Sequence, residues 1–195
     1  MDIALTISII SIIISVSTFW LTKISRGTLK MTRPSIICFA GKNGNDEPKI
    51  FLRTLLFATS DLGQYIQSMY IRVHRTETTQ NFNTWAYGDG DLVLGSGIHI
   101  SKTGLSTYHH FLLSKNENWD FLVGEYRLEI FAETINNNTK KLFEQILVVT
   151  KEQAETMSKD KRASVFFHWA PNSNKYISHI TSKPYTTEEH MSLIS

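Results

Sequence analysis

The chain of 195 residues has few cysteines and prolines and little excess of charge of either sign. Its single cysteine, Cys38, cannot form an internal disulfide, and no cysteine cluster is present to bind zinc or an iron–sulfur centre. Four prolines and ten glycines exclude collagen-like and Pro/Gly-rich disordered chains. Twenty Lys and Arg against eighteen Asp and Glu give a net charge of +2, so composition alone does not indicate nucleic-acid binding.

Residues 3–21 form one apolar run without a charged side chain. A helix of that length would extend about 28 Å, close to the thickness of a bilayer core. We therefore expect residues 1–22 to be an uncleaved transmembrane anchor and residues 23–34 a basic juxtamembrane linker. Basic residues follow the run and only Asp2 precedes it, which predicts a single-pass protein of the plasma (inner) membrane with its N-terminus outside and a cytoplasmic soluble domain. The side chains expected to contact lipid headgroups are Lys23, Arg26, Lys30 and Arg33.

Small and hydroxylated residues recur along this run at spacings of four and three, which places them on one face of a helix. In lipid, such side chains allow helices to pack closely, so we expect the helix to pair with a second copy or with a partner's transmembrane helix. The alternative is that each hydroxyl binds the carbonyl four residues before it. The residues of this stripe are Ala4, Ser8, Ser11, Ser15, Thr18 and Thr22.

After residue 34 the sequence alternates apolar and polar residues, with turn residues at intervals of roughly ten positions. This pattern predicts an all-β antiparallel sandwich over residues 35–170 and a flexible tail over 171–195. Thr150 and Gln153 have the spacing of a capping box, which predicts one short surface helix. Segment 49–60 has apolar residues at both odd and even positions, so both faces of the strand are expected to be covered. It is therefore predicted to be a central strand. The expected strands are 35–40, 49–60, 65–75, 82–87, 92–100, 108–113, 125–135, 142–149 and 165–169, and the expected helix is 151–161.

The segment 122–132, LVGEYRLEIFA, resembles the strand of immunoglobulin-like and fibronectin-like sandwiches that carries the tyrosine corner. In that superfold, a tyrosine shortly after a glycine opens a strand whose alternate residues enter the core. The resemblance implies an immunoglobulin-like sandwich in which Tyr126 has a structural role. Alternation by itself predicts that Tyr126, Leu128 and Ile130 face inward.

The ionisable residues form no complete catalytic or metal-binding set in the sequence. His109 and His110 are adjacent, so in a strand their rings point to opposite faces. His99 and His110 could face each other across a hairpin, but no nearby Cys, Asp or Glu completes a metal shell. Neither a Gly-x-Ser-x-Gly elbow nor a phosphate-binding glycine loop is present. We therefore predict no enzymatic activity, no cofactor and no bound metal.

Aromatic residues provide the best candidate for a recognition surface. Trp85 and Tyr87 share one parity of an expected strand, and Phe167 and Trp169 lie in another just before a loop. Aromatic side chains left outside a core often form a partner-binding patch. The alternative is that these four residues pack in the core.

These observations lead to one leading hypothesis and one alternative. The leading hypothesis is a non-enzymatic, membrane-anchored protein whose cytoplasmic sandwich binds a protein or small ligand, with the bilayer and a partner helix as further partners and no nucleic acid. The alternative is a membrane-disrupting or signalling effector whose β domain senses a soluble signal such as a nucleotide. In layout alone it is similar to membrane-anchored β-barrel effectors of bacterial cyclic-oligonucleotide immunity.

Overall fold

Two antiparallel sheets and two helices make up the part of the chain that the computed structural model describes, which is residues 3–20, 27–42, 47–115, 117–135 and 138–182. The large sheet has eight strands in this part, ordered β13-β12-β2-β3-β9-β6-β7 with β1 pairing β3. Its strands are β1 (Leu29–Met31), β2 (Ile36–Ala40), β3 (Lys49–Ala58), β6 (Thr84–Tyr87), β7 (Val93–Leu94), β9 (Leu105–Leu112), β12 (Ser164–Ala170) and β13 (Lys175–Thr181).

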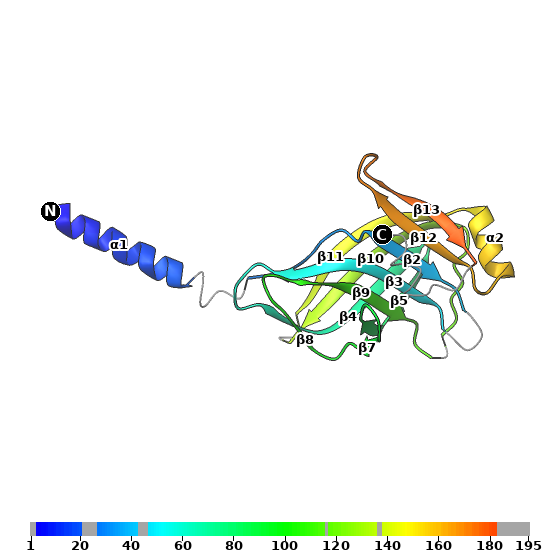
Figure 1. The fold of residues 1–195 in the computed structure, drawn as a ribbon, viewed down its shortest axis with the longest axis horizontal. Coiled ribbons are helices and arrows are strands. Elements are labelled where there is room, and N and C mark those ends of the chain that lie inside the picture. The colour runs from blue at the N-terminus through cyan, green and yellow to red at the C-terminus, as the bar shows by residue number, and fades with distance from the viewer. Residues whose placement is uncertain (1–2, 21–26, 43–46, 116, 136–137, 183–195) are drawn as a thin grey trace.

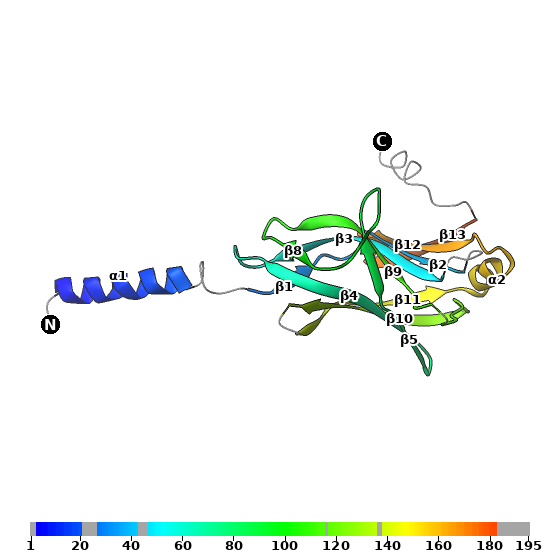
Figure 2. The same ribbon diagram turned by 90° about the horizontal axis from the view of Figure 1, so that it is seen from below.

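The small sheet has five strands in the described residues, ordered β11-β10-β4-β5 with β8 pairing β4. Its strands are β4 (Gln64–Arg75), β5 (Thr78–Phe82), β8 (Ile98–Ile100), β10 (Gly124–Thr134) and β11 (Thr139–Val149). The two sheets lie face to face as two layers, with helix α2 (Lys151–Lys159) at one end (Figure 2). Both layers contribute side chains to one apolar core, so the chain forms a two-layer β-sandwich.

The strand order contains the arrangement of an immunoglobulin constant domain. Strands β2-β3-β9-β6 correspond to the order A-B-E-D, and strands β4-β10-β11 to C-F-G. Strands β12 and β13 extend the large sheet beyond the A position, and β5 extends the small sheet beyond C. Strand β10 therefore occupies the F position, the strand on which immunoglobulin domains carry the tyrosine corner.

Alternation along β10 explains how the small sheet closes the core. Tyr126, Leu128 and Ile130 are fully buried, whereas Arg127 is exposed, as a strand with one covered face requires. The Tyr126 hydroxyl donates a 2.6 Å hydrogen bond to the carbonyl of Leu122. This bond fixes the start of the strand while the ring stays in the core.

A cluster of aromatic rings at the centre of the sandwich joins the two sheets. Phe39 of β2 is fully buried, and its ring centroid lies 4.7 Å from that of Phe121, 5.1 Å from Phe167 and 5.6 Å from Tyr126. Residues from both layers therefore contact one side chain. Such packing is the main source of stability for a sandwich of this kind.

The predicted surface helix is confirmed, with α2 ending two residues earlier than expected. The Thr150 hydroxyl accepts from the Gln153 backbone N–H at 3.2 Å, and the Gln153 side chain accepts from the Thr150 N–H at 3.0 Å. These reciprocal bonds satisfy two of the N–H groups that the first turn of a helix leaves unpaired. Met157 and Gln153 are its buried residues.

Three strands lie where the sequence pattern predicts none. β1 falls within residues 23–34, β5 lies between two expected strands apart from Phe82, and β13 falls within residues 171–195. These segments are short or rich in polar residues, so period-two alternation of apolar side chains does not mark them. Each of these strands forms instead by pairing with a neighbouring strand of the sheet.

The prediction of a transmembrane anchor at residues 1–22 is wrong. Helix α1 (Ile3–Phe19) has 17 residues, which gives a length of about 26 Å against a bilayer core of about 30 Å. Within the described ranges, no helix is both long and apolar enough to span a bilayer. The correction applies equally to the single-pass and signal-anchor interpretations. Figure 1 shows α1 beyond one end of the sandwich, and none of its residues is buried there.

Candidate functional site

A row of rings crosses the outer face of the large sheet. The residues directly opposite one another on β13, β12, β2, β3 and β9 are His179, Phe166, Cys38, Phe51 and His110. Ring centroids in this row are 5.4 Å apart for Phe166 and His179, 5.9 Å for Phe51 and Phe166, and 5.2 Å for Phe51 and His110. We call these five residues the ring row.

A second apolar cluster lies beneath this face, separate from the main core. Its members are between 0% and 8% exposed, although they project from the side of the sheet opposite the sandwich interior. An outward sheet face is normally polar, so these buried apolar side chains form a second packed cluster on the outer side of the large sheet. We call this group the outer cluster: Ile36, Cys38, Phe51, Tyr108 and Phe166.

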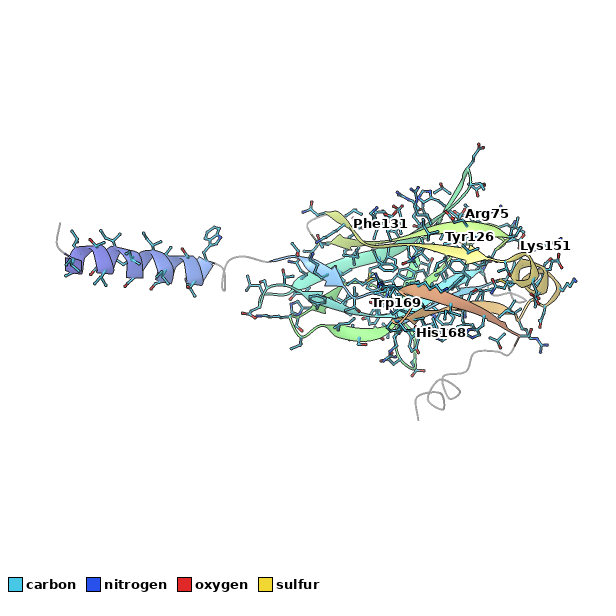
Figure 3. The ribbon with its side chains drawn as sticks, turned by 90° about the horizontal axis from the view of Figure 1, so that it is seen from above. Arg75, Tyr126, Phe131, Lys151, His168 and Trp169 are labelled. Atoms are coloured by element: carbon cyan, nitrogen blue, oxygen red, sulfur yellow. The ribbon has the colours of Figure 1, made fainter. Side chains whose placement is uncertain are left out.

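The neighbouring row adds histidine and arginine to the face. Ile177, His168, Ile36, Arg53 and Tyr108 are opposite one another on β13, β12, β2, β3 and β9. The imidazole rings of His168 and His179 are stacked with centroids 4.8 Å apart. In Figure 3, the labelled His168 belongs to β12 in one layer, whereas Tyr126 and Phe131 belong to β10 in the other.

Arg53 holds the loop after β6 against the edge of this face. Its guanidinium carbon lies 4.8 Å from the Tyr108 ring centroid, and its Nη1 donates to Asp89 Oδ1 at 3.0 Å. The same carboxylate oxygen accepts from the Tyr108 backbone N–H at 3.2 Å and from the Thr107 hydroxyl at 3.3 Å. Asp89 therefore has its charge satisfied within the protein.

The strands of the large sheet contain no aspartate or glutamate. Their sequences include lysine, arginine and histidine, whereas the small sheet carries four glutamates: Glu125, Glu129, Glu133 and Glu144. Residues 46–195 as a whole hold 15 basic and 17 acidic residues, a net of −2. Among the strands of this segment, the carboxylates therefore lie on the small sheet, whereas lysine and arginine occur on both sheets.

Two adjacent histidines on β9 stay neutral under physiological conditions. Burial lowers the pKa of His109 to about 4, and the neighbouring His110 adds to the shift. Burial likewise lowers the pKa of His110 to about 4, with a contribution from Lys49. His109 Nδ1 accepts a hydrogen bond of 3.2 Å from the indole N–H of Trp85. His109 is therefore a core residue, while His110 belongs to the ring row.

The outer face of the small sheet differs because its charges are paired among themselves. Glu129 accepts from His74 Nε2 at 3.0 Å and from Lys141 Nζ at 3.1 Å, and Lys141 also binds Glu144. Burial raises the pKa of Glu129, the bonds from His74 and Lys141 lower it, and the net direction is downward. This arrangement leaves less unbalanced charge for a partner than the outer face of the large sheet does.

The structure divides the predicted aromatic patch between two distant strands. Trp85 and Tyr87 lie on β6, Phe167 and Trp169 lie on β12, and β2, β3 and β9 separate these strands. At about 4.8 Å per strand spacing, the separation is roughly 19 Å. Trp85 and Phe167 are buried in the main core, as the core alternative predicts for them. The Trp169 ring packs under the guanidinium of Arg33 at 3.8 Å.

His99 and His110, considered above as partners across a hairpin, lie in different sheets. His99 of β8 lies opposite Tyr65 of β4 in the small sheet, and their ring centroids are 4.6 Å apart. His110 lies opposite Ala86 and Phe51 in the large sheet. Among the described residues, no group of three or more His, Cys, Asp or Glu side chains could hold a metal ion.

The predicted stripe on the N-terminal helix has two hydroxyls bound within the helix itself. Ser8 donates to the Ala4 carbonyl at 2.9 Å and Thr18 to the Ile14 carbonyl at 2.8 Å, the alternative considered above. Ser11 and Ser15 lie in the same helix, and Thr22 lies outside the described residues.

Two of the four cations predicted to contact lipid headgroups lie within the described residues. Lys23 and Arg26 lie outside the described residues. Lys30 is an exposed residue of β1, and Arg33 packs over Trp169 as described above.

No protein-family model matches this chain, and no curated protein matches it. Among solved structures, the chain is similar to Spo0M, a sporulation control protein of Bacillus subtilis, with 8% identity and a TM-score of 0.34. The match covers 85% of this chain and 71% of that chain. A similarity of this size carries no argument about function.

Proposed function

We propose that this chain is a non-enzymatic binding module that recognises an extended acidic segment of a protein partner through the outer face of its large sheet. The observation that carries the proposal is the outer cluster, which places aromatic and aliphatic side chains on the outside of a sheet whose strands contain no carboxylate. Aromatic residues are enriched at the buried centres of protein interfaces.

The charges around the outer cluster favour an acidic partner. Lys49 and Arg53 project from β3 beside Phe51, and Lys175 lies on β13. Arg53 is already paired with Asp89, but this pair is half-exposed, and such pairs are worth little in water. A carboxylate of a partner can therefore approach these cations without opposing charge on the strands themselves. Complementary charge of this kind improves specificity and association rate more than it improves affinity.

The geometry of the face favours an extended segment. Rows of side chains cross five strands at about 4.8 Å spacing, and successive rows along a strand are about 7 Å apart. An extended peptide presents alternate side chains at the same period of about 7 Å. A peptide lying on this face can thus place apolar side chains over the ring row and carboxylates beside Lys49 and Arg53.

Arginine side chains do not converge on a nucleotide site in the described residues. Arg33 packs on Trp169, Arg53 on Tyr108, and Arg72 lies 5.1 Å from the ring of Phe131 on the small sheet. Since three arginines contact three rings in different places, the geometry favours the protein-binding module over the nucleotide-sensing alternative.

Substituting Ile177 with glutamate should weaken partner binding at least about tenfold, because it places a negative charge beside the ring row. Ile177 is 54% exposed and lies on β13, so the change is compatible with folding. Ile146 is the matched control, because it is 51% exposed and lies on β11 in the small sheet. Ile146→Glu adds the same charge and should change affinity less than about twofold.

The probe is a set of acidic peptides selected from a random displayed library against the full chain, and the measurement is fluorescence anisotropy. Equal losses in Ile177→Glu and Ile146→Glu would contradict the assignment of the face. Failure of every acidic peptide to bind, with binding of RNA instead, would contradict the class of partner.

A further inference from the structure

Strand β13 ends the large sheet, and one of its two sides has no neighbouring strand among the described residues. Figure 1 shows this strand, in orange, at the margin of the sandwich. We propose that its free side pairs antiparallel with β13 of a second copy of the chain, so that two large sheets become one continuous sheet. The inference goes beyond the proposed function, because it concerns assembly and does not depend on an acidic partner.

The backbone of β13 presents alternate residues to this free side. In an antiparallel ladder, the N–H and C=O of one residue point to the same neighbouring strand, and successive residues alternate. The Trp169 N–H donates to the Ser35 carbonyl at 3.0 Å, so the backbone groups of Trp169 point away from β13. Tyr176 lies opposite Trp169, and its own N–H and C=O therefore point away from β12. By alternation, those of Ser178 and Ile180 also point to the free side.

The other strands that end the two sheets are less suited to such pairing. β7 has two residues, β5 has five, and the pairing of β11 with β10 is interrupted by a register shift. By contrast, all seven residues of β13 pair with β12 without a shift, and the strand contains no proline. An uninterrupted sheet edge of this kind is a template for one further strand.

The sequence of β13 is complementary to itself in the register that pairs its full length. That register is symmetric about Ser178, which then lies opposite Ser178 of the second copy. The three residues directed to the free side of each strand supply about six hydrogen bonds. Tyr176 lies opposite Ile180, an aromatic and β-branched pair of the kind that stabilises sheets. Lys175 lies opposite Thr181, so like charges are not opposed.

The pairing also joins the outer faces of the two copies. Ile177 is 54% exposed and lies opposite His179 of the second copy in this register, at the end of the ring row. Helix α2 lies against β13 through a 3.0 Å hydrogen bond from Gln153 Nε2 to Ser178 Oγ. Its sequence, KEQAETMSK, holds two lysines and two glutamates, so it adds no net charge beside the strand. Two ring rows therefore become parts of one surface.

The test is the self-association of the full chain, measured by sedimentation equilibrium over a range of concentrations. Ser178→Pro removes an N–H directed to the free side and keeps the bonds to β12, because proline is tolerated on a sheet edge. It should raise the Kd of the dimer at least about tenfold. Ser178→Ala removes only the hydroxyl that binds Gln153 and should change this Kd less than about twofold. Helix α1 is present in all three chains and therefore does not distinguish them.

Oxidation of a Ser178→Cys variant tests the register directly. Opposite residues of a hydrogen-bonded pair have Cα atoms about 5.5 Å apart, within the range of about 4.4 to 6.8 Å that a disulfide spans. This variant should therefore form a covalent dimer. The unsubstituted chain should not, because its single cysteine, Cys38, is buried. Ile146→Cys on β11 is the matched control and should not cross-link either.

Three results would overturn the proposal: a monomer at every concentration, one Kd for Ser178→Pro and the unsubstituted chain, or cross-linking of Ser178→Cys no faster than that of Ile146→Cys. If thermal unfolding shows that Ser178→Pro does not fold, the comparison of the two cysteine variants decides. Binding of acidic peptides by a monomeric chain would leave the proposed function standing. The failure of the assembly and the failure of the binding function are therefore distinguishable.

Discussion

Replacing Phe39 with alanine should lower the free energy of unfolding by about 3 to 5 kcal/mol, the range for removing a large aromatic side chain from a packed core. Phe39 is fully buried and contacts the rings of Phe121, Tyr126 and Phe167, which come from both sides of the sandwich. The cavity left behind would separate the two sheets where they are most closely joined. Urea unfolding followed by tryptophan fluorescence measures the loss.

Phe131 provides the matched control for this substitution. It is half-buried on the outer side of the small sheet, where it stacks on Tyr70 with ring centroids 4.9 Å apart. Phe131→Ala removes the same side chain without opening the core and should cost roughly 1 kcal/mol. Equal losses for the two variants would contradict the central position of Phe39.

Acidification from about pH 7 to about pH 5 should destabilise the protein by roughly 2 kcal/mol through His109 alone. The pKa of His109 is lowered from 6.5 to about 4 by burial, so in this range the unfolded chain takes up a proton that the folded chain does not. The unfolded state is therefore favoured as the pH falls. His110 acts in the same direction, because its pKa is also lowered to about 4.

The pH dependence can be assigned by substitution. His109→Gln removes the titrating ring and retains a side-chain oxygen that can accept from the Trp85 indole N–H, so the loss of stability between these two pH values should fall to about half. Glu129 has a lowered pKa and contributes only at more acidic pH. Unfolding free energies that are equal at the two pH values in the unsubstituted protein would contradict the neutral, buried state of His109.

The side chains that face the core of the sandwich were predictable, because alternation of apolar and polar residues along a strand indicates that one face of the strand is covered. Tyr126, Leu128 and Ile130 on β10 face the core as the period of two requires. The apolar residues on both parities of segment 49–60 likewise predicted a covered second face, and β3 is a central strand of the large sheet with Phe51 in the outer cluster.

The candidate site was not predictable because it depends on the order of strands in space. Residues 38, 51, 110, 166 and 179 are far apart in the sequence, and only the order β13-β12-β2-β3-β9 aligns them in one row. The sequence pattern indicates which side chains of one strand share a face, but it does not indicate which strands are neighbours in a sheet. The one available signal was the absence of carboxylates from these segments, which is visible in the sequence once the strands are known.

The predicted anchor failed for a related reason. Apolarity was counted over residues 3–21, whereas the helix extends over Ile3–Phe19 and includes six serine and threonine residues. Continuous absence of charge therefore overstated the length of the helix that forms.

The most direct test of the account is a map of where an acidic peptide binds, obtained from backbone amide chemical shifts of the full chain during titration with a selected peptide. The account predicts the largest shifts at the ring row and its neighbours on β13, β12, β3 and β9, with small shifts on β10 and β11. Shifts concentrated around Phe131 and Ile146 on the small sheet would contradict it.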